Sequence, residues 1–269
     1  HVDACIGGFL LAYLKKIGND IPLFDFKLSG VTSLSVDLHK YAYAPKGSSV
    51  LLYRKEELRK EQFSVYPNWE GGIYGSTTFL GTKPGGIVAS TWMALNHIGE
   101  DGYVKLTHKT MQATKVLSDY IQKSKDLSLI GNPIMSLLAF NSEKHDIYQV
   151  ADLLSEKGWY IGRLQNPPGI HLVVSQIHAD GAAKELVEDM EEIIEKLNTS
   201  KIKNKLSKVG DNLSVNAVKS LGYKSLKKAV VASTGTKNSK KRLIYDLKSS
   251  LDLDQSNDLF KSILNRFYQ

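Results

Sequence analysis

The chain has 269 residues, of which 42% are hydrophobic and 23% charged, an ordinary composition for a soluble globular protein of one or two domains. No window approaches the roughly 18 apolar residues that a membrane-spanning helix needs, and the first residues lack a signal-peptide pattern. The single cysteine, Cys5, excludes an intrachain disulfide framework, and its lack of His or Cys neighbours at ligand spacing argues against a metal site. We expect Cys5 to be a small packing residue in a reducing compartment.

The net charge of +7 is unevenly distributed along the chain. Residues 1–200 carry 20 Lys and Arg against 23 Asp and Glu, whereas residues 201–269 carry 15 against 5. A basic tail of this kind favours a solvated or partly helical extension, and contact with an anionic membrane surface is an alternative. The tail carries no signature of a nucleic-acid-binding fold, so we expect no nucleic-acid partner.

Hydrophobic periodicity predicts an alternation of strands and helices. In chain order the predicted elements are a strand at 2–4, a helix at 9–17, strands at 33–36 and 49–53, an aperiodic segment at 63–86 with eight glycines and prolines, and helices at 87–98 and 103–121. After a break at Asn132-Pro133 come a strand at 135–140, a helix at 147–157, strands at 159–164 and 170–175, a helix at 181–197, and weak tail helices at 217–226 and 258–267.

This order predicts an α/β protein. We interpret residues 1–100 as the end of a large sheet domain, residues 101–198 as a small C-terminal α/β domain, and residues 199–269 as a basic tail that is partly helical or disordered.

A lysine stands where the predicted strand at 33–36 ends. Lys40 follows His39 directly and precedes a turn made rigid by Pro45 and Gly47. A lysine fixed in this way suits an amine that forms a Schiff base with an aldehyde cofactor. The alternative is an ordinary surface lysine, which needs no such surroundings.

A lone carboxylate occurs near the end of the first predicted strand. Asp3 is followed by small residues, which allow the backbone to lie close to a flat ring. In a pyridoxal phosphate site, an aspartate bonded to the pyridine nitrogen keeps that nitrogen protonated, so that the ring can accept electrons. Asp3 and Lys40 lie 37 positions apart, a natural separation for groups on different strands of one sheet. Together they make pyridoxal phosphate chemistry the leading hypothesis.

Segments 1–10, 33–53 and 71–86 together resemble the sphingosine-1-phosphate lyase family, which has the fold-type-I architecture of pyridoxal phosphate enzymes and is related to the group II amino acid decarboxylases. The resemblance extends over residues 1–195. It implies that the chain comprises the C-terminal part of the large domain of a pyridoxal phosphate-dependent transferase fold, plus the small α/β domain. Two departures stand out: Ala42 replaces an expected glycine, and the cofactor-stacking histidine and much of the phosphate-binding loop are expected upstream of residue 1.

The resemblance assigns roles to individual residues. It makes Lys40 the Schiff-base lysine, Asp3 the partner of the pyridine nitrogen, and His39 a neighbour of the cofactor phosphate or ring, with a histidine satisfied by the backbone as the alternative. For a phosphorylated amino alcohol, Lys46 would bind the phosphate and Tyr74 would transfer a proton or hold the phosphate. A surface lysine and a packing tyrosine are the alternatives.

A hydroxyl- and glycine-rich loop follows Tyr74. Ser76, Thr77 and Gly85 are candidates for binding the cofactor phosphate through exposed backbone N–H groups. In related enzymes this loop reaches the cofactor of the partner subunit, which implies a homodimer with a shared active site; a simple crossing loop is the alternative. The remaining tyrosine and histidine candidates are expected to be structural: Tyr41, Tyr43, His97, His108, His145, His171 and His178.

The resemblance implies an aldehyde-lyase that cleaves the C2–C3 bond of sphingosine 1-phosphate to a long-chain fatty aldehyde and phosphoethanolamine. An amino acid decarboxylase remains an alternative, because it would share Asp3, His39 and Lys40. A truncated, inactive chain that acts as a dimer partner or lipid-binding scaffold is a third possibility, and this piece alone is expected to be inactive. The expected location faces the cytosol, with endoplasmic reticulum association through a segment outside this chain.

Overall fold

The computed structural model describes residues 1–199, 227 and 251–267, which fall into two compact units. The first unit contains residues 1–114, 133–136 and 174–180. The second contains residues 115–132 and 137–173 and the described residues from 181 onward. Within the described residues, no helix is long and apolar enough to cross a membrane.

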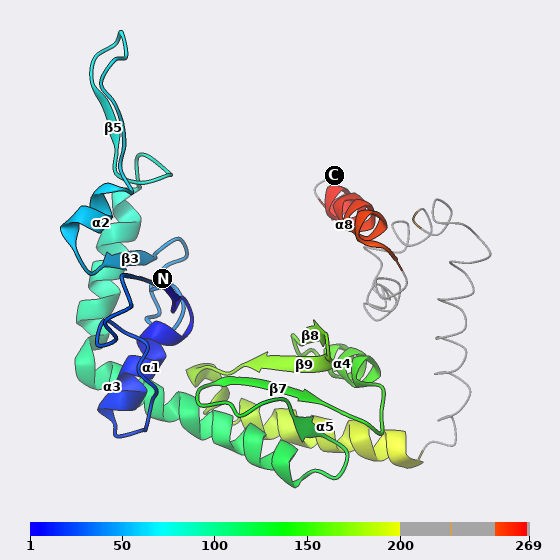
Figure 1. Ribbon diagram of the computed structural model, residues 1–269. Helices are drawn as coiled ribbons and strands as arrows, with labels where there is room; N and C mark the ends of the chain where they lie inside the picture. The colour runs from blue at the N-terminus through cyan, green and yellow to red at the C-terminus, as the bar shows by residue number, and fades with distance from the viewer. Residues whose placement is uncertain (200–226, 228–250, 268–269) are drawn as a thin grey trace. The chain divides into compact units, whose positions relative to one another are not determined.

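The first unit is built on a three-stranded sheet in the order β1-β2-β3 (Figure 1). β1 (Val2–Asp3) runs parallel to β2 (Ser33–Val36), and β3 (Val50–Tyr53) pairs antiparallel with β2. The parallel pair requires a crossover connection, and α1 (Gly7–Lys16) supplies its helix. Because β1 and β2 are parallel, the residues that follow both strands emerge at the same edge of the sheet. The strands and helix predicted for residues 1–53 are therefore confirmed.

Aromatic and aliphatic side chains fix α1 against its surroundings. Leu10 and Leu14 are the buried residues of this helix. The rings of Phe9, Tyr13 and Tyr103 lie 4.7 to 5.3 Å from one another, at tilted or edge-on angles that aromatic quadrupoles favour. This cluster ties α1 to the long helix α3 (Gly85–Lys123), which contains Tyr103.

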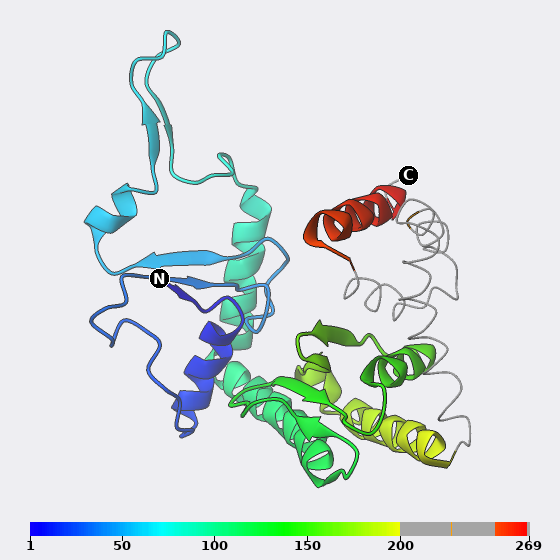
Figure 2. The same ribbon diagram turned by 45° about the vertical axis from the view of Figure 1, so that its right-hand side comes forward.

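A hairpin projects from the sheet in both views (Figure 2). β4 (Ser64–Tyr66) pairs antiparallel with β5 (Tyr74–Ser76), and the short helix α2 (Glu56–Lys60) precedes it. The expectation of an aperiodic segment at 63–86 is wrong for these strands. Their residues are mostly exposed on both faces, so no alternation of polar and apolar residues marks them in the sequence.

The helix α3 (Gly85–Lys123) is interrupted at Gly99, whose φ of 60° and ψ of 179° are non-helical. Glycine adopts such a backbone conformation without the steric penalty that a Cβ atom would bring. The two helices predicted at 87–98 and 103–121 are therefore confirmed, with Gly99 between them. The part of α3 up to Thr114 belongs to the first unit.

The second unit has a four-stranded antiparallel sheet in the order β6-β7-β9-β8. The strands are β6 (Ser128–Leu129), β7 (Leu137–Asn141), β8 (Gly162–Gln165) and β9 (Pro168–Val173), and the helices are α4 (Ile147–Glu156) and α5 (Ala182–Thr199). Leu138 and Phe140 of β7 are buried and alternate with half-buried neighbours, as expected for a strand with one face on a core. The helices and the three longer strands were predicted, whereas β6 was not.

Two further elements complete the described chain. The 3-10 helix η1 (Gln176–His178) belongs to the first unit, and α8 (Leu253–Phe267) includes the helix predicted at 258–267. The helix predicted at 217–226 lies outside the described residues. The division into domains at residues 100 and 198 stays a prediction.

Candidate active site

The structure brings Asp3 and Lys40 to the same edge of the first sheet. Asp3 is the last residue of β1 and pairs with Ser35 of β2, and Lys40 lies in the turn that follows β2. The backbone N–H of Asp37 donates to the carbonyl oxygen of Cys5 at 3.2 Å, which joins the two strand ends directly. The carboxyl edge of parallel strands is where α/β sheets bind their ligands.

Lys40 makes an ion pair within its own turn. Its Nζ lies 2.8 Å from Oδ2 of Asp37, three residues earlier. The other carboxylate oxygen of Asp37 accepts a 2.6 Å hydrogen bond from the hydroxyl of Ser49. Asp37 raises the pKa of Lys40 above its usual value, and Lys40, followed by Ser49, lowers the pKa of Asp37. Lys40 is therefore held as an ammonium ion in this arrangement.

His39 is held by the backbone on one side of its ring. Nδ1 lies 2.7 Å from the carbonyl oxygen of Ser48 and donates to it, and the backbone N–H of His39 donates to the same oxygen at 3.1 Å. Its Nε2 lies 3.8 Å from Oδ2 of Asp37. The ring orientation is therefore fixed by Nδ1, and Nε2 points toward the Asp37–Lys40 pair.

Asp3 is set up to stay ionised. Its Oδ1 accepts hydrogen bonds from the backbone N–H of Cys5 at 3.1 Å and from the hydroxyl of Ser35 at 3.2 Å. The Cys5 backbone, the Cys5 thiol and Ser35 lower the pKa of Asp3 below its usual value, and the charge of Lys40 acts in the same direction. The carboxylate remains exposed, so it can bond to a cationic partner from outside the chain.

The turn after Lys40 is closed by backbone hydrogen bonds and held by the buried side chain of Tyr41. The N–H of Ala44 donates to the carbonyl oxygen of Leu38 at 3.0 Å, and Tyr43 adopts a left-handed φ of 55°. The Tyr41 hydroxyl donates to the carbonyl oxygen of Val174 at 2.8 Å and lies 2.5 Å from the hydroxyl of Ser136. Tyr41 is thus buried and hydrogen-bonded, as suits its expected structural role.

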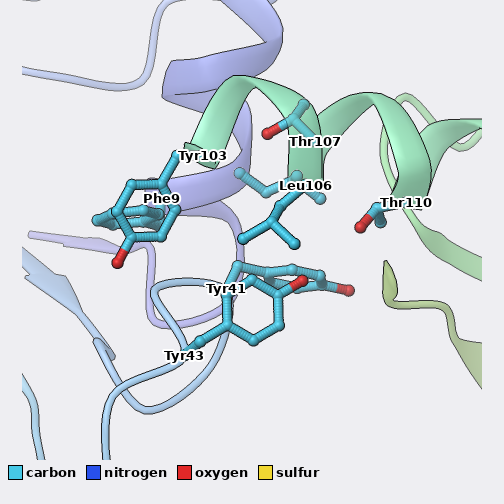
Figure 3. A pocket seen from close by; sticks show the side chains of 8 residues that line it. Phe9, Tyr41, Tyr43, Tyr103, Leu106, Thr107 and Thr110 are labelled. Atoms are coloured by element: carbon cyan, nitrogen blue, oxygen red, sulfur yellow. The ribbon is translucent and has the colours of Figure 1, made fainter. Parts of the chain in front are cut away.

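A small cavity lies beside this turn (Figure 3). It measures about 10 Å³, at most enough space for a single water molecule and far less than a cofactor or amino acid requires. Thr110 contributes a buried hydroxyl that has no hydrogen-bond partner among the described residues. The cavity is therefore a packing space between α1, the turn and α3. Its lining residues are Phe9, Leu10, Tyr41, Tyr43, Tyr103, Leu106, Thr107 and Thr110.

The turn that carries Lys46 approaches the start of α3, where Gly85 lies. Lys46 is exposed in a turn in which Gly47 has a φ of 91°, and a Cβ atom on Gly47 would meet Ile87 of α3 at 3.4 Å. The hydroxyl of Thr91 in α3 donates to that of Ser48 at 2.8 Å, which holds the turn against the helix. Gly85 is the first residue of α3.

The remaining candidates, Tyr74, Ser76 and Thr77, lie on the projecting hairpin (Figures 1 and 2). The ring of Tyr74 is exposed and packs edge-on against Trp69, with 6.2 Å between the ring centroids. The Ser76 hydroxyl donates to the carbonyl oxygen of Thr78 at 2.7 Å. The structure does not bring these three residues together with Lys40 of the same chain.

Two residues of the site were missed in the sequence. Asp37 was not singled out, although an acidic residue three positions before a candidate lysine is a signal for a local ion pair. Cys5 was expected to be a small packing residue, but it is half-buried and its thiol affects the pKa of both Asp3 and Lys40. No pattern marks Cys5, because its position follows from the pairing of β1 with β2.

Comparison with known proteins identifies the family. The profile of the pyridoxal-dependent decarboxylase conserved domain matches residues 1–143, more than half of the chain. The chain belongs to the pyridoxal-dependent decarboxylase family. Asp3, His39 and Lys40 all lie within the matched region. Membership of this family confirms the prediction that the cofactor is pyridoxal phosphate.

Several sphingosine-1-phosphate lyases are relatives of this chain, so the resemblance noted in the sequence is confirmed. The chain is 44% identical to the Arabidopsis thaliana lyase over 72% of its own length and 45% identical to lyase 1 of Rattus norvegicus over 66%. It spans 36% and 32% of the lengths of those two proteins.

Solved structures confirm the fold of the family. The sphingosine-1-phosphate lyase of Burkholderia pseudomallei is 35% identical with a TM-score of 0.71, covering 79% of this chain and 48% of that one. Glutamate decarboxylase of Lactobacillus brevis, at 22% identity and a TM-score of 0.62, shares the fold over 74% of this chain and 47% of its own.

The donor set at the sheet edge fits pyridoxal phosphate. A primary amine, Lys40, and an exposed carboxylate whose pKa is lowered, Asp3, lie at one edge, where they suit an aldehyde carbon and a protonated pyridine nitrogen respectively. Lys40 and Asp3 would therefore hold opposite parts of one ring.

Proposed function

We propose that this chain is part of a pyridoxal phosphate-dependent aldehyde-lyase that cleaves the C2–C3 bond of sphingosine 1-phosphate, giving a long-chain fatty aldehyde and phosphoethanolamine. The observation that carries the proposal is the convergence of Asp3 and Lys40 at one sheet edge. This convergence occurs in a chain that is 44% identical to a sphingosine-1-phosphate lyase. Bound pyridoxal phosphate supplies an electron sink for the electrons of the breaking bond.

Lys40 and Asp3 have complementary tasks in this proposal. The Lys40 amine attaches the cofactor and, once released, carries a proton beside the reacting carbon. Asp3 keeps a negative charge next to the pyridine nitrogen, because hydrogen bonds from Cys5 and Ser35 lower its pKa. His39, whose Nδ1 is committed to Ser48, offers its ring face and Nε2 to the cofactor.

Lys46 and Tyr74 are proposed to act on the substrate. The exposed Lys46 ammonium lies in a turn held against α3 and would bind the substrate phosphate. The Tyr74 hydroxyl would take the proton of the C3 hydroxyl as the C2–C3 bond breaks. Ser76, Thr77 and Gly85 would present hydroxyl and backbone N–H groups to the cofactor phosphate.

We further propose that Tyr74, Ser76 and Thr77 complete the site of a second copy of the chain in a homodimer. The hairpin that carries them projects from its own unit (Figure 1). Ile73 on the hairpin, and Phe79 and Leu80 in the segment that follows β5, are at least 80% exposed. Large exposed apolar side chains gathered on one element mark an interaction surface. A second copy is the occupant that would also bring these hairpin residues to a Lys40.

For location, we propose a reducing compartment facing the cytosol, with the basic tail contacting anionic membrane. The lone cysteine and the excess of Lys and Arg after residue 200 support this. Sedimentation of the full-length protein with vesicles of phosphatidylserine and phosphatidylcholine should fall when residues 201–269 are removed. Equal sedimentation would contradict the membrane contact.

The activity is tested by comparing substrates. Full-length protein loaded with pyridoxal phosphate is incubated with sphingosine 1-phosphate, glutamate or DOPA, and fatty aldehyde and carbon dioxide are measured. We expect aldehyde from sphingosine 1-phosphate and none from the Lys40→Ala variant. Release of carbon dioxide from the amino acids without aldehyde formation would replace the lyase proposal by a decarboxylase.

Cofactor attachment is tested independently of turnover. Borohydride reduction of the loaded protein, followed by peptide mass spectrometry, should place the pyridoxyl group on Lys40. Labelling of another lysine, or scattered labelling of surface lysines, would contradict the role given to Lys40.

A further inference from the structure

We propose that Asp37 is a positioning residue that holds the free amine of Lys40 as an ammonium ion at the sheet edge whenever Lys40 is not bonded to cofactor. The inference rests on the proposed role of Lys40 in cofactor attachment. It adds a control on when the lysine can react.

The geometry makes Asp37 a fixed partner for the amine. Its Oδ2 lies 2.8 Å from Lys40 Nζ, and its Oδ1 accepts from the Ser49 hydroxyl at 2.6 Å. Its backbone N–H is bonded to the Cys5 carbonyl oxygen, and its own carbonyl oxygen accepts from the Lys40 N–H. The backbone of Asp37 is therefore anchored to Cys5 and Lys40, and the Ser49 hydroxyl holds its carboxylate in place beside the lysine.

This pair differs from an ordinary surface ion pair in its surroundings. The side chains of Lys40 and Asp37 are 30% and 18% exposed, whereas those of the surface pair Lys115 and Asp119 are 74% and 36% exposed at a similar distance of 2.9 Å. Partial shielding from water strengthens the attraction between opposite charges. Asp37 should thus affect its lysine much more than Asp119 affects Lys115.

Every charged or titratable group that faces the Lys40 amine is identifiable. Asp37 raises the pKa of Lys40 most, and the Cys5 thiol acts in the same direction with a smaller effect. Asp3 interacts with Lys40 through its charge, and His39 lies 3.8 Å from Asp37 rather than against the amine. Asp37 is the dominant partner, so its removal should be visible above the others.

The chemical consequence follows from the protonation state. An amine adds to an aldehyde only as the neutral form, and the condensation forms one C=N bond and releases one water molecule. Asp37 opposes the loss of the proton that must precede this step. Conversely, when a substrate amine displaces Lys40, the released lysine takes up a proton that Asp37 stabilises, which disfavours its return. Asp37 therefore shifts the balance between attached and free lysine toward the free form.

The test measures the amine itself, without cofactor or turnover. Full-length protein freed of pyridoxal phosphate is acetylated briefly at a series of pH values, and the labelling of each lysine is followed by mass spectrometry. The variants are Asp37→Asn, which removes the charge; Asp37→Glu, which keeps it; and Ser49→Ala, which frees the carboxylate. Asp119→Asn is the matched control, read out at both Lys115 and Lys40.

We expect the pH midpoint of Lys40 labelling to fall by about one unit or more in Asp37→Asn, which corresponds to about tenfold more neutral amine at neutral pH. Asp37→Glu keeps the charge, so its Lys40 midpoint should lie near that of wild-type protein. Ser49→Ala should lower the midpoint less than Asp37→Asn does. Asp119→Asn should leave the Lys40 midpoint unchanged. Circular dichroism and thermal melting establish that each variant is folded; should Asp37→Asn not fold, Ser49→Ala carries the test.

An unchanged Lys40 midpoint in folded Asp37→Asn, or in folded Ser49→Ala where that variant carries the test, would overturn the proposal. This failure is distinct from failure of the proposed function. Borohydride mapping to another lysine would refute the role of Lys40, whereas the acetylation midpoint reports only on the Asp37–Lys40 pair.

Discussion

The hydroxyl group of Tyr103 donates a 2.8 Å hydrogen bond to the carbonyl oxygen of Ala42, two residues beyond Lys40. Both residues are buried, and Tyr103 belongs to α3. The helix therefore fixes the backbone of the turn that positions the candidate cofactor lysine. Because a buried carbonyl group without a partner is costly, this single hydroxyl group links the packing of α3 to the geometry of the site.

Replacing Tyr103 by Phe should destabilise the first unit by about 1–2 kcal/mol, because the Ala42 carbonyl oxygen loses its buried donor. Urea unfolding of the two proteins measures the difference. Tyr13→Phe is the matched control, since it removes a hydroxyl from a neighbouring ring of the same cluster. A loss in Tyr103→Phe no larger than in Tyr13→Phe would show that the hydrogen bond contributes little.

The same tyrosine predicts a loss of stability at alkaline pH. Burial, with a smaller effect from Tyr13 and Tyr43, raises the pKa of Tyr103 to about 12, above the usual 10. Above pH 10 the unfolded chain loses this proton first, so the contribution to stability is present below about pH 10 and is lost as the pH rises toward 12. Between about pH 9 and pH 11, the free energy of unfolding of wild-type protein should fall more than that of Tyr103→Phe. Parallel curves would contradict this assignment.

Ala42 stands where the family resemblance predicts glycine, and the structure explains why alanine is accepted. Among the described residues, Tyr43 is the non-glycine residue with a positive φ, so Ala42 lies in a region open to any residue. Its side chain is fully buried. Ala42→Gly should therefore lower stability by about 0.5–1 kcal/mol through greater freedom of the unfolded chain. A stabilised Ala42→Gly variant in thermal melting would show that the alanine strains the turn.

The convergence of Asp3 and Lys40 could be predicted because Asp3 ends one short strand, Lys40 lies in the turn after the next strand, and a helix lies between the two strands. Strand–helix–strand order implies parallel strands, and parallel strands place their carboxyl ends together. The pairing of Asp37 with Lys40 was less visible. The sequence contains both residues, but which carboxylate a lysine meets depends on the backbone hydrogen bonds of the turn.

The hairpin shows a different limit of sequence reasoning. Val65, Tyr66, Ile73 and Tyr74 are exposed on both faces, so the alternation that marks a half-buried strand is missing. Antiparallel pairing of residues 64–66 with 74–76 follows from backbone hydrogen bonds rather than from burial. The location of Tyr74, Ser76 and Thr77 away from Lys40 could not be read from their spacing, because a hairpin can point in any direction from its sheet.

The second unit contains an acid-sensitive contact. Oδ1 of Asp126 lies 2.5 Å from Lys144 Nζ, and Oδ2 accepts a hydrogen bond from Asn198 Nδ2 at 2.9 Å. Both contacts lower the pKa of Asp126, and Lys144 has the larger effect. The stabilisation is therefore present above the unfolded pKa of about 3.9 and is lost as the pH falls through the lower folded value. Wild-type protein should lose more stability between pH 6 and 3 than Asp126→Asn, measured by urea unfolding. Asp119→Asn, which removes a carboxylate from an exposed ion pair, is the control and should follow the wild-type curve. If the free energy of unfolding of Asp126→Asn falls with pH as steeply as that of wild-type protein, the prediction is wrong.

Lys40 and the hairpin residue Tyr74 lie apart within one chain, so a site shared between two chains can be tested by mixing variants. Lys40→Ala and Tyr74→Phe homodimers should each be inactive toward sphingosine 1-phosphate. Each mixed dimer would contain one site with both residues intact, because Lys40 and Tyr74 of one site come from different chains. Random pairing of equal amounts should therefore restore about one quarter of the wild-type activity.

Lys40→Ala mixed with Asp3→Ala is the matched control for this experiment. Both residues lie at the same sheet edge of one chain, so every site of a mixed dimer lacks one of them and no activity should return. Native mass spectrometry measures how many mixed dimers have formed. If mixed dimers form and the Lys40→Ala and Tyr74→Phe pair stays inactive, Tyr74 acts within its own chain, and the hairpin must then move toward its own sheet edge for the reaction.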